Sequence, residues 1–242
     1  EKIRTDAAGM VEDSATVCSQ ETRDLPSHRT VTRVETIEDK GSQTRKYNEP
    51  KELTTNDKGE LVVADWKKER VQILDWTGHC RICLSFKSFG KQIKPCGVAV
   101  SRDGKYYIID RSNHQIVVCG EDNTIITTFR HYYKSIRLSA IALTMNEYVL
   151  VTDWHKHCLS KYTVDGIYVA DLGEEGEGAC QFKPLKSVVV NSKNQIIVSD
   201  GSNHRIQVFD SQFRFLYSRG STRDNQLLDP WGVDVDSQDN IY

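Results

Sequence analysis

The chain has 242 residues, and its 32 Lys and Arg residues against 34 Asp and Glu residues give a formal net charge of −2. This balance excludes a histone-like or polybasic tail protein, so a nucleic-acid site would have to be a local patch. The length is sufficient for one large or two small domains, and all-β chains of this length often form a single domain. Val, Ile, Thr and Tyr far outnumber Ala, Leu and Met, which favours strands over helices.

Cysteine usage and the first residues indicate the compartment. The seven cysteines are an odd number without regular short spacing, in a domain large enough to fold without disulfides, which favours a reducing, intracellular setting. No apolar run approaches the ~18 residues of a membrane span. The opening EKIRTDAAGM has neither a signal-peptide layout nor an initiator Met. We expect a cytoplasmic protein without a membrane partner, and a fragment of a longer chain.

The N-terminal segment differs from the rest of the chain. Residues 1–28 are rich in acidic and poor in apolar side chains, and they are predicted to form a linker or disordered tail. The folded domain is expected to occupy residues 29–242 and to begin with a strand near residues 30–37.

Four segments of this domain repeat one pattern, in which an apolar run ends in a shared Asp. The shared residues, spaced by 45, 43 and 47 positions, are Asp65, Asp110, Asp153 and Asp200. A proline precedes the first apolar run at Pro50, Pro95, Pro184 and Pro230, the last of these in the partial unit, and the repeat near Leu138 lacks it. The predicted repeats span about 47–90, 91–134, 135–180 and 181–226, with a partial unit at 227–242.

Each repeat is predicted to form four short antiparallel strands. The first follows the proline, and a polar turn such as RDGK from Arg102 supplies the chemistry of a tight hairpin. The second strand ends at the shared Asp, and the third and fourth are stretches such as RIQVF from Arg205 and FRFLYS from Phe213. A period of about 40–45 residues with four strands is typical of a β-propeller blade. Helical solenoids of this period would need apolar residues spaced by 3.6.

Two of these units resemble the NHL repeat, which is named for an Asn-His-Leu turn. The fourth unit, from Phe182 to Phe215, and the second, from Pro95 to Cys119, combine a P-x-G-V-A-V-like run, a strand ending in Asp and the pair Asn113-His114 or Asn203-His204. The motif is weaker in the third unit, with Lys156-His157, and in the first, with Lys68-Glu69.

The resemblance implies an all-β fold, a β-propeller of four-stranded antiparallel blades of the NHL type. It covers residues 47–242 approximately, and six blades are expected in the full protein. About 4.5 blades are present here, so we expect that further residues beyond the given ones close the ring.

Several suggestive residue groups are better explained by structure. The shared Asp is expected to accept hydrogen bonds from the turn that follows it. The histidines at one repeat position, His114, His157 and His204, are expected to stabilise turns, because successive blades hold them too far apart to share a zinc ion. Cys80-x-x-Cys83 lacks a second ligand pair, and positions 80 and 83 of a regular strand face opposite sides. No nucleophile elbow, phosphate loop or HExxH string occurs. We therefore expect no catalytic residue, metal or cofactor, and no small-molecule substrate.

The remaining signal is a set of basic and aromatic residues in loops that share one face of a propeller. Basic side chains bind the phosphates of a nucleic-acid backbone, and flat side chains stack on unpaired bases. Residue types alone are equally consistent with ordinary loop packing and solvated charge. Acidic residues on this face gather at Glu174, Glu175 and Glu177. The predicted RNA- or partner-binding residues are Trp66, Lys67, Lys68, Lys94, Arg111, Arg130, Tyr132, Tyr133, Lys134, Arg137, Trp154 and Lys156.

Two functional hypotheses follow. The resemblance implies a non-catalytic recognition module, like the C-terminal propeller of tripartite-motif (TRIM-NHL) proteins, which binds protein partners or single-stranded or structured RNA. In that family a RING and B-boxes confer ubiquitin ligase activity, and no such cysteine pattern occurs in these 242 residues. The alternative is a metal-dependent propeller enzyme of the lactonase or amidating-lyase type. The positions expected to line the axis are largely Val, Ala and Ile, which are poor metal ligands.

Overall fold

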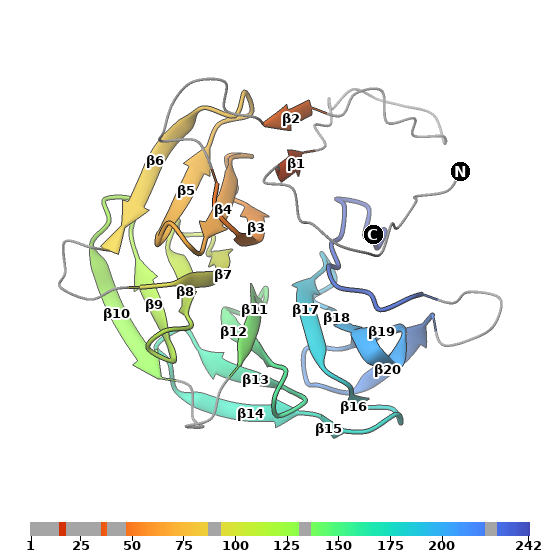
Figure 1. Cartoon of the computed structure of the whole chain (residues 1–242). Coiled ribbons are helices and arrows are strands. Elements are labelled where there is room, and N and C mark those ends of the chain that lie inside the picture. Colours follow the sequence, from red (N-terminus) through yellow and green to blue (C-terminus); the bar gives the residue numbers. More distant parts are fainter. Residues whose placement is uncertain (1–14, 18–34, 38–46, 87–92, 131–136, 221–226) are drawn as a thin grey trace.

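The computed structural model describes residues 15–17, 35–37, 47–86, 93–130, 137–220 and 227–242. These residues form almost only strands and turns, and four of the sheets are four-stranded and arranged as blades around one axis (Figure 1). The predicted all-β propeller of four-stranded antiparallel blades is confirmed. None of the helical residues in the described ranges belongs to a helix that is long and apolar enough to span a membrane.

The blades follow one another along the chain. The first contains β3 (Pro50–Thr55), β4 (Leu61–Asp65), β5 (Arg70–Leu74) and β6 (Cys80–Ser85). The second contains β7 (Pro95–Val100), β8 (Tyr106–Asp110), β9 (Gln115–Cys119) and β10 (Ile125–Arg130). The third contains β11 (Leu138–Leu143), β12 (Tyr148–Asp153), β13 (Cys158–Thr163) and β14 (Tyr168–Leu172). The fourth contains β17 (Leu185–Val190), β18 (Ile196–Asp200), β19 (Arg205–Phe209) and β20 (Phe215–Arg219).

Smaller elements flank the blades. A short parallel pair, β15 (Glu174–Glu175) and β16 (Gln181–Phe182), leads into the fourth blade. A bridge between Val235 and Ile241 begins a fifth unit. Of the strand expected near residues 30–37, only β2 (Glu35–Ile37) is described, and it pairs with β1 (Ala15–Val17).

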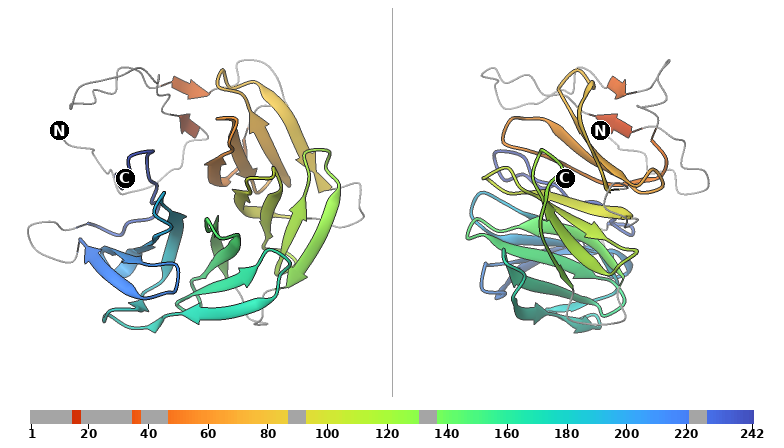
Figure 2. Two further views of the ribbon diagram at one scale, coloured as in Figure 1. Left: turned by 180° about the vertical axis from the view of Figure 1, so that it is seen from behind. Right: turned by 90° about the vertical axis from the view of Figure 1, so that its left-hand side faces the viewer.

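The core lies between neighbouring blades. The inner strands β3, β7, β11 and β17 surround the axis, and successive sheets pack face to face (Figure 2). Because the middle strands are covered by a neighbouring blade on each face, every residue of β8, β9, β18 and β19 is buried. These strands therefore read as continuous apolar runs with one polar end, as in YYIID and IIVSD. Burial on both faces compensates for the modest apolar content of the chain.

The first hairpin of each repeat closes with one turn geometry. In the second repeat, Ser101 N donates to Lys105 O and Gly104 N donates to Ser101 O, both at 2.9 Å. We number the turn residues from the one equivalent to Ser101. The fourth of them adopts a positive φ in all five units, at Gly59, Gly104, Glu147, Asn194 and Asp239. A left-handed residue at this point matches the twist of the paired strands, and only glycine adopts it without steric cost.

This turn geometry gives a test of the fold. Gly104 has a φ of +78°, and a Cβ placed there would meet nothing within 4 Å, so the cost of Gly104→Ala comes from the backbone alone. We expect this substitution to lower the free energy of unfolding by about 1 kcal/mol. Gly104→Asn should cost less, because Asn tolerates this conformation.

The matched control is Gly232→Ala, at a position where a Cβ also meets nothing within 4 Å but φ is not positive. It should leave the urea-unfolding free energy unchanged or raise it by up to about 1 kcal/mol. Equal effects of the two alanine substitutions would contradict the turn assignment.

Candidate binding face

The four shared aspartates are completely buried at the ends of β4, β8, β12 and β18. In three repeats, Oδ1 of the aspartate accepts a hydrogen bond from the loop that leads into the same blade, from the backbone N–H of Asn48 (2.9 Å), Lys94 (3.1 Å) and Lys183 (2.8 Å). In the third repeat, Asp153 Oδ1 accepts from the N–H groups of His155 at 2.9 Å and Lys156 at 3.2 Å, in the following turn. The expected hydrogen bond from the following turn is therefore present at Asp153. In the other three repeats the aspartate binds the lead-in loop, a contact that the sequence did not predict.

The second carboxylate oxygen holds the turn itself. Asp200 Oδ2 accepts hydrogen bonds from Asn203 Nδ2 and Arg205 Nε, both at 2.9 Å. Asp110 Oδ2 accepts from Asn113 Nδ2 at 2.6 Å and from Gln115 Nε2 at 3.0 Å. The Asn of each Asn-His pair thus binds the shared aspartate and has a structural role.

The residue four positions after each shared Asp adopts a left-handed backbone conformation. Its φ lies between 53° and 57° at Glu69, His114, His157 and His204. His204 Nδ1 also accepts a hydrogen bond from Asp229 N at 3.1 Å, which joins the fourth repeat to the fifth. The His204 side chain thus bonds to the next repeat and not to its own turn, and the feature common to all four positions is the backbone conformation.

These contacts build one face of the propeller, which we call the Asp face. It consists of the turns that follow the four shared aspartates and the loops that lead into the inner strands. The residues directly after the aspartates are placed there, and they are Trp66, Arg111, Trp154 and Gly201.

Cations stack on the tryptophans of the Asp face. The Arg111 guanidinium lies 4.9 Å from the centre of the Trp66 ring, and Lys51 Nζ lies 5.2 Å from it. The Arg137 guanidinium lies 4.6 Å from the centre of the Trp154 ring. The structure thus brings together four of the predicted residues in two pairs from neighbouring loops. The indoles hold the cations in place, and a stacked guanidinium keeps its edge donors available.

The sequence analysis missed a third pair of this kind. Lys186 Nζ lies 4.2 Å from the centre of the Trp231 ring, and Trp231 is 67% exposed. Lys51 and Lys186 are both the second residue of an inner strand, so comparing the repeats at this position would have identified them. The basic and aromatic arc therefore continues from the first three repeats onto the fourth and fifth.

The other predicted residues are less uniform. Lys67 forms an ion pair with Glu49, and the hydrogen bond from Lys67 lowers the pKa of Glu49. Lys94 contributes its backbone N–H to Asp110, and Arg130 is exposed at the end of the outermost strand of its blade. Lys68 and Lys156 lie in turns of the Asp face. The remaining predicted residues lie outside the described ranges, and they are Tyr132, Tyr133 and Lys134.

The acidic segment of the Asp face precedes the fourth blade. Glu174 and Glu175 form β15 and are exposed. Glu177 pairs with Lys183 at 2.5 Å, which lowers the pKa of Glu177 through a hydrogen bond. The carboxylates before the fourth blade therefore interrupt the cations of the Asp face, which lie over the first three blades and, with Lys186, on the fourth.

One acidic side chain lies near the axis, where apolar residues were expected. Glu52, on β3, accepts a hydrogen bond from Val98 N at 2.9 Å and another from the backbone N–H of Ile141. A single carboxylate thus joins the inner strands of three blades. A Cβ at position 97 would lie 2.7 Å from Glu52 Oε2 and from Ile109 Cδ1, so Gly97 makes room for this contact.

The protein environment disfavours ionisation of Glu52. The residue keeps partial contact with solvent, but the surrounding inner strands raise its pKa well above the ordinary value through burial, against the opposite effect of its two hydrogen bonds. The sequence pattern did not indicate this residue, because its role depends on two other blades.

The expected orientation of the Cys80-x-x-Cys83 pair is wrong. In the pairing of β5 with β6, Leu74 faces Cys80, Ile73 faces Ile82 and Gln72 faces Cys83. Arg81 is therefore an extra residue, a β-bulge, and the two cysteines lie on the same face of the strand. Within the described ranges, no group of three or more His, Cys, Asp or Glu residues is arranged to hold a metal ion.

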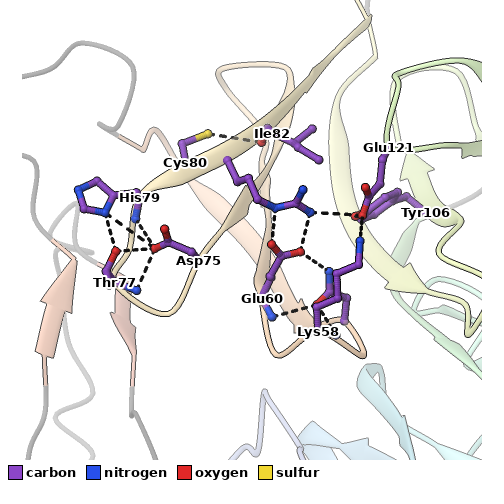
Figure 3. A network of polar contacts seen from close by, with 11 residues as sticks. Lys58, Glu60, Asp75, Thr77, His79, Cys80, Ile82, Tyr106 and Glu121 are labelled. Atoms are coloured by element: carbon purple, nitrogen blue, oxygen red, sulfur yellow. Dashed lines mark hydrogen bonds and ion pairs between the residues drawn. The ribbon is translucent and has the colours of Figure 1, made fainter.

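The face opposite the Asp face carries an ion-pair network between the first two blades (Figure 3). Arg81 pairs with Glu60, donating from Nη2 to Oε2 at 2.7 Å, and it approaches Glu121 of the second blade at 3.3 Å. Lys58 Nζ donates to Glu121 at 2.8 Å. The hydrogen bond from Arg81 lowers the pKa of Glu60.

Comparisons with known proteins agree with this architecture. A family model described as NHL repeat matches residues 94–119 and 186–209. The chain is 47% identical to Protein brain tumor of Drosophila melanogaster over 71 residues, 28% of this chain and 7% of that protein. It is 45% identical to B-box type zinc finger protein ncl-1 of Caenorhabditis elegans over 51 residues, 21% of this chain and 6% of that protein. The β-propeller therefore contains NHL repeats at residues 94–119 and 186–209, and the chain spans a small part of both curated relatives.

Solved structures support the same fold. The streptogramin B lyase structure aligns with a TM-score of 0.63 and 14% identity, over 79% of this chain and 60% of that chain. The WD40 β-propeller domain of Doa1 aligns with a TM-score of 0.58 and 13% identity, over 78% and 58% of the two chains. At these identities the likeness establishes the propeller architecture alone.

The buried carboxyl of Glu52 makes the stability depend on pH. Because the pKa of Glu52 is raised in the folded protein, folding favours its protonated form, and its contribution to stability falls as the pH rises from about 4.5 through the raised pKa. Glu52→Gln keeps an oxygen acceptor and removes this titration. The free energy of unfolding of the variant relative to the unmodified protein should therefore increase over that range.

Glu60→Gln is the matched control, since Arg81 lowers the pKa of Glu60. Its relative stability should change in the opposite direction, because the Glu60 contribution is present above the ordinary carboxyl pKa and is lost as the pH falls. Urea unfolding from about pH 2 to pH 8 covers both ranges. A difference for Glu52→Gln that does not change with pH would overturn the assignment.

Proposed function

We propose that this propeller is a non-catalytic recognition module that binds single-stranded RNA across its Asp face. The observation that carries the proposal is the set of three cation–indole pairs on that face, Arg111 with Lys51 on Trp66, Arg137 on Trp154 and Lys186 on Trp231. They belong to a chain whose formal net charge is −2, so the positive charge is concentrated locally.

The physical argument rests on the stacked cations. An indole holds a guanidinium flat and ordered, so less side-chain entropy is lost when the guanidinium binds a phosphate. The exposed Trp231 ring offers a flat surface for an unpaired base, and such stacking contributes about 1–3 kcal/mol per base. Single-stranded RNA presents both groups at once, whereas bases within a duplex are covered by their neighbours.

The wider context of the proposal is a TRIM-like E3 ubiquitin ligase. The resemblance to TRIM-NHL proteins supports it, and the name of one relative records a B-box type zinc finger. In this proposal the propeller selects the target, a RING outside residues 1–242 confers ubiquitin ligase activity, and the protein acts in the cytoplasm. Recruitment of a protein partner through the same face is the competing outcome, and the RNA experiment below separates the two.

The test is a salt titration of binding to labelled, random-sequence single-stranded RNA. The affinity should fall steeply with salt, with a slope of about 0.7 per phosphate contact on a double-logarithmic plot. Arg137→Gln and Arg111→Gln should each weaken binding about tenfold and reduce that slope by roughly one contact.

Arg214→Gln is the control, because Arg214 is a strongly exposed arginine on the opposite face, paired with Asp210 at 2.6 Å. It should leave both affinity and slope unchanged. A flat salt response, or equal effects of all three substitutions, would exclude RNA binding at the Asp face and leave protein recruitment.

A further inference from the structure

The turns on the face opposite the Asp face connect neighbouring blades by a repeated contact. The backbone N–H of the second turn residue in one repeat donates to the side chain of the left-handed turn residue in the next. Met145 N donates to Asn194 Oδ1 at 2.8 Å, between the third and fourth blades. Ser192 N donates to Asp239 Oδ1 at 2.9 Å and Ser192 Oγ to Asp239 Oδ2 at 2.8 Å, between the fourth and fifth units.

This contact is missing between the second and third blades. The equivalent residues there are Arg102 and Glu147, and within the described part of the chain no hydrogen bond joins them. A cavity of about 210 Å³ opens between the two turns instead. Its apolar wall includes Val100, Leu143, Met145 and Val164.

The rim of this cavity carries a cation without an anionic partner among the described residues. Arg102 Nη2 donates to Met145 Sδ at 2.8 Å, and a thioether is a weak and neutral acceptor. The neighbouring Lys105 is neutralised by Asp103 at 2.7 Å. Glu147 lies across the cavity on the third blade, so the rim has a positive side and a negative side.

Tyr107 supplies a polar group inside the cavity. The residue is only 3% exposed and lies in the cavity wall. Burial raises its pKa, so the hydroxyl remains protonated and available as a hydrogen-bond donor. The cavity therefore combines an apolar wall with a few polar groups, which is the usual composition of a ligand site.

We infer that this cavity binds a peptide segment of a partner protein that carries a carboxylate next to a large apolar side chain. Asp239 shows how the carboxylate would bind, since it accepts hydrogen bonds from the backbone N–H and side chain of Ser192 at the equivalent turn. At the second blade the same positions are the backbone N–H and guanidinium of Arg102, and among the described residues Glu147, the equivalent of Asp239, forms no hydrogen bond with them, so a ligand carboxylate can accept from both.

The size and polarity of the cavity specify the rest of the segment. A volume of 210 Å³ exceeds that of a benzene-sized cavity of about 150 Å³, so one Leu, Ile, Met or Phe side chain fits. Glu147 accepts a backbone N–H of the peptide on the opposite rim. The site lies on the face opposite the proposed RNA site, so RNA and peptide bind at the same time and neither interaction depends on the other.

A random heptapeptide library displayed on phage tests this inference. Peptides selected on the protein should be enriched in Asp or Glu adjacent to Leu, Ile, Met or Phe. A synthetic peptide of the selected sequence should bind the Arg102→Gln variant at least about tenfold more weakly, and Arg102→Lys should retain part of the affinity because it keeps the charge. Met145→Trp should reduce binding by filling the cavity.

The matched control is Lys193→Gln, in the equivalent turn of the fourth repeat, where Asp239 already occupies the acceptor position. It should bind the peptide as the unmodified protein does. Failure to enrich any sequence, enrichment without a carboxylate, or equal binding to the Arg102→Gln variant would each overturn the inference.

Discussion

The buried aspartate of each repeat is the interaction on which the rest of the architecture depends. At Asp200 one carboxylate accepts hydrogen bonds from a lead-in loop through Lys183 N and from a turn through Asn203 and Arg205. A completely buried carboxylate is costly unless donors surround it, and three of these aspartates draw a lead-in loop to the end of the second strand. The repeat geometry follows from this requirement, because the lead-in loop, the inner strand and the turn must converge on one carboxylate.

The same constraint positions the side chains of the Asp face, where we propose that RNA binds. The residue after each aspartate starts from a fixed turn, which places the Trp66 and Trp154 rings beside neighbouring segments of the same face. Trp66 and Trp154 therefore receive cations from adjacent segments at 4.6–5.2 Å. The opposite face is held by different contacts, mainly hydrogen bonds between turns and the Arg81 network (Figure 3), and the cavity opens between the turns of the second and third blades.

The sequence predicts the secondary structure within each repeat, but it does not predict the side-chain contacts between blades. The spacing of the shared aspartates, the hairpin turns and the apolar runs predicted the four-stranded blades and the propeller, because these features are local. Glu52, which bonds to Val98 and Ile141, depends on three inner strands that are distant in sequence. The shared face of Cys80 and Cys83 depends on a bulge at Arg81 that no residue type marks. Trp231 and Lys186 were missed for the same reason, since their pairing requires two successive repeats.

The central claim is that the cation–indole pairs of the Asp face bind single-stranded RNA, and the four tryptophans of the chain test it in one experiment. Trp66, Trp154 and Trp231 lie on the Asp face, whereas Trp76 is 87% exposed in a turn on the opposite face. In a nuclear magnetic resonance titration with single-stranded RNA, the account predicts that the indole N–H signals of the first three shift and that of Trp76 does not. A shift confined to Trp76, or no shift of the other three at saturating RNA, would contradict it.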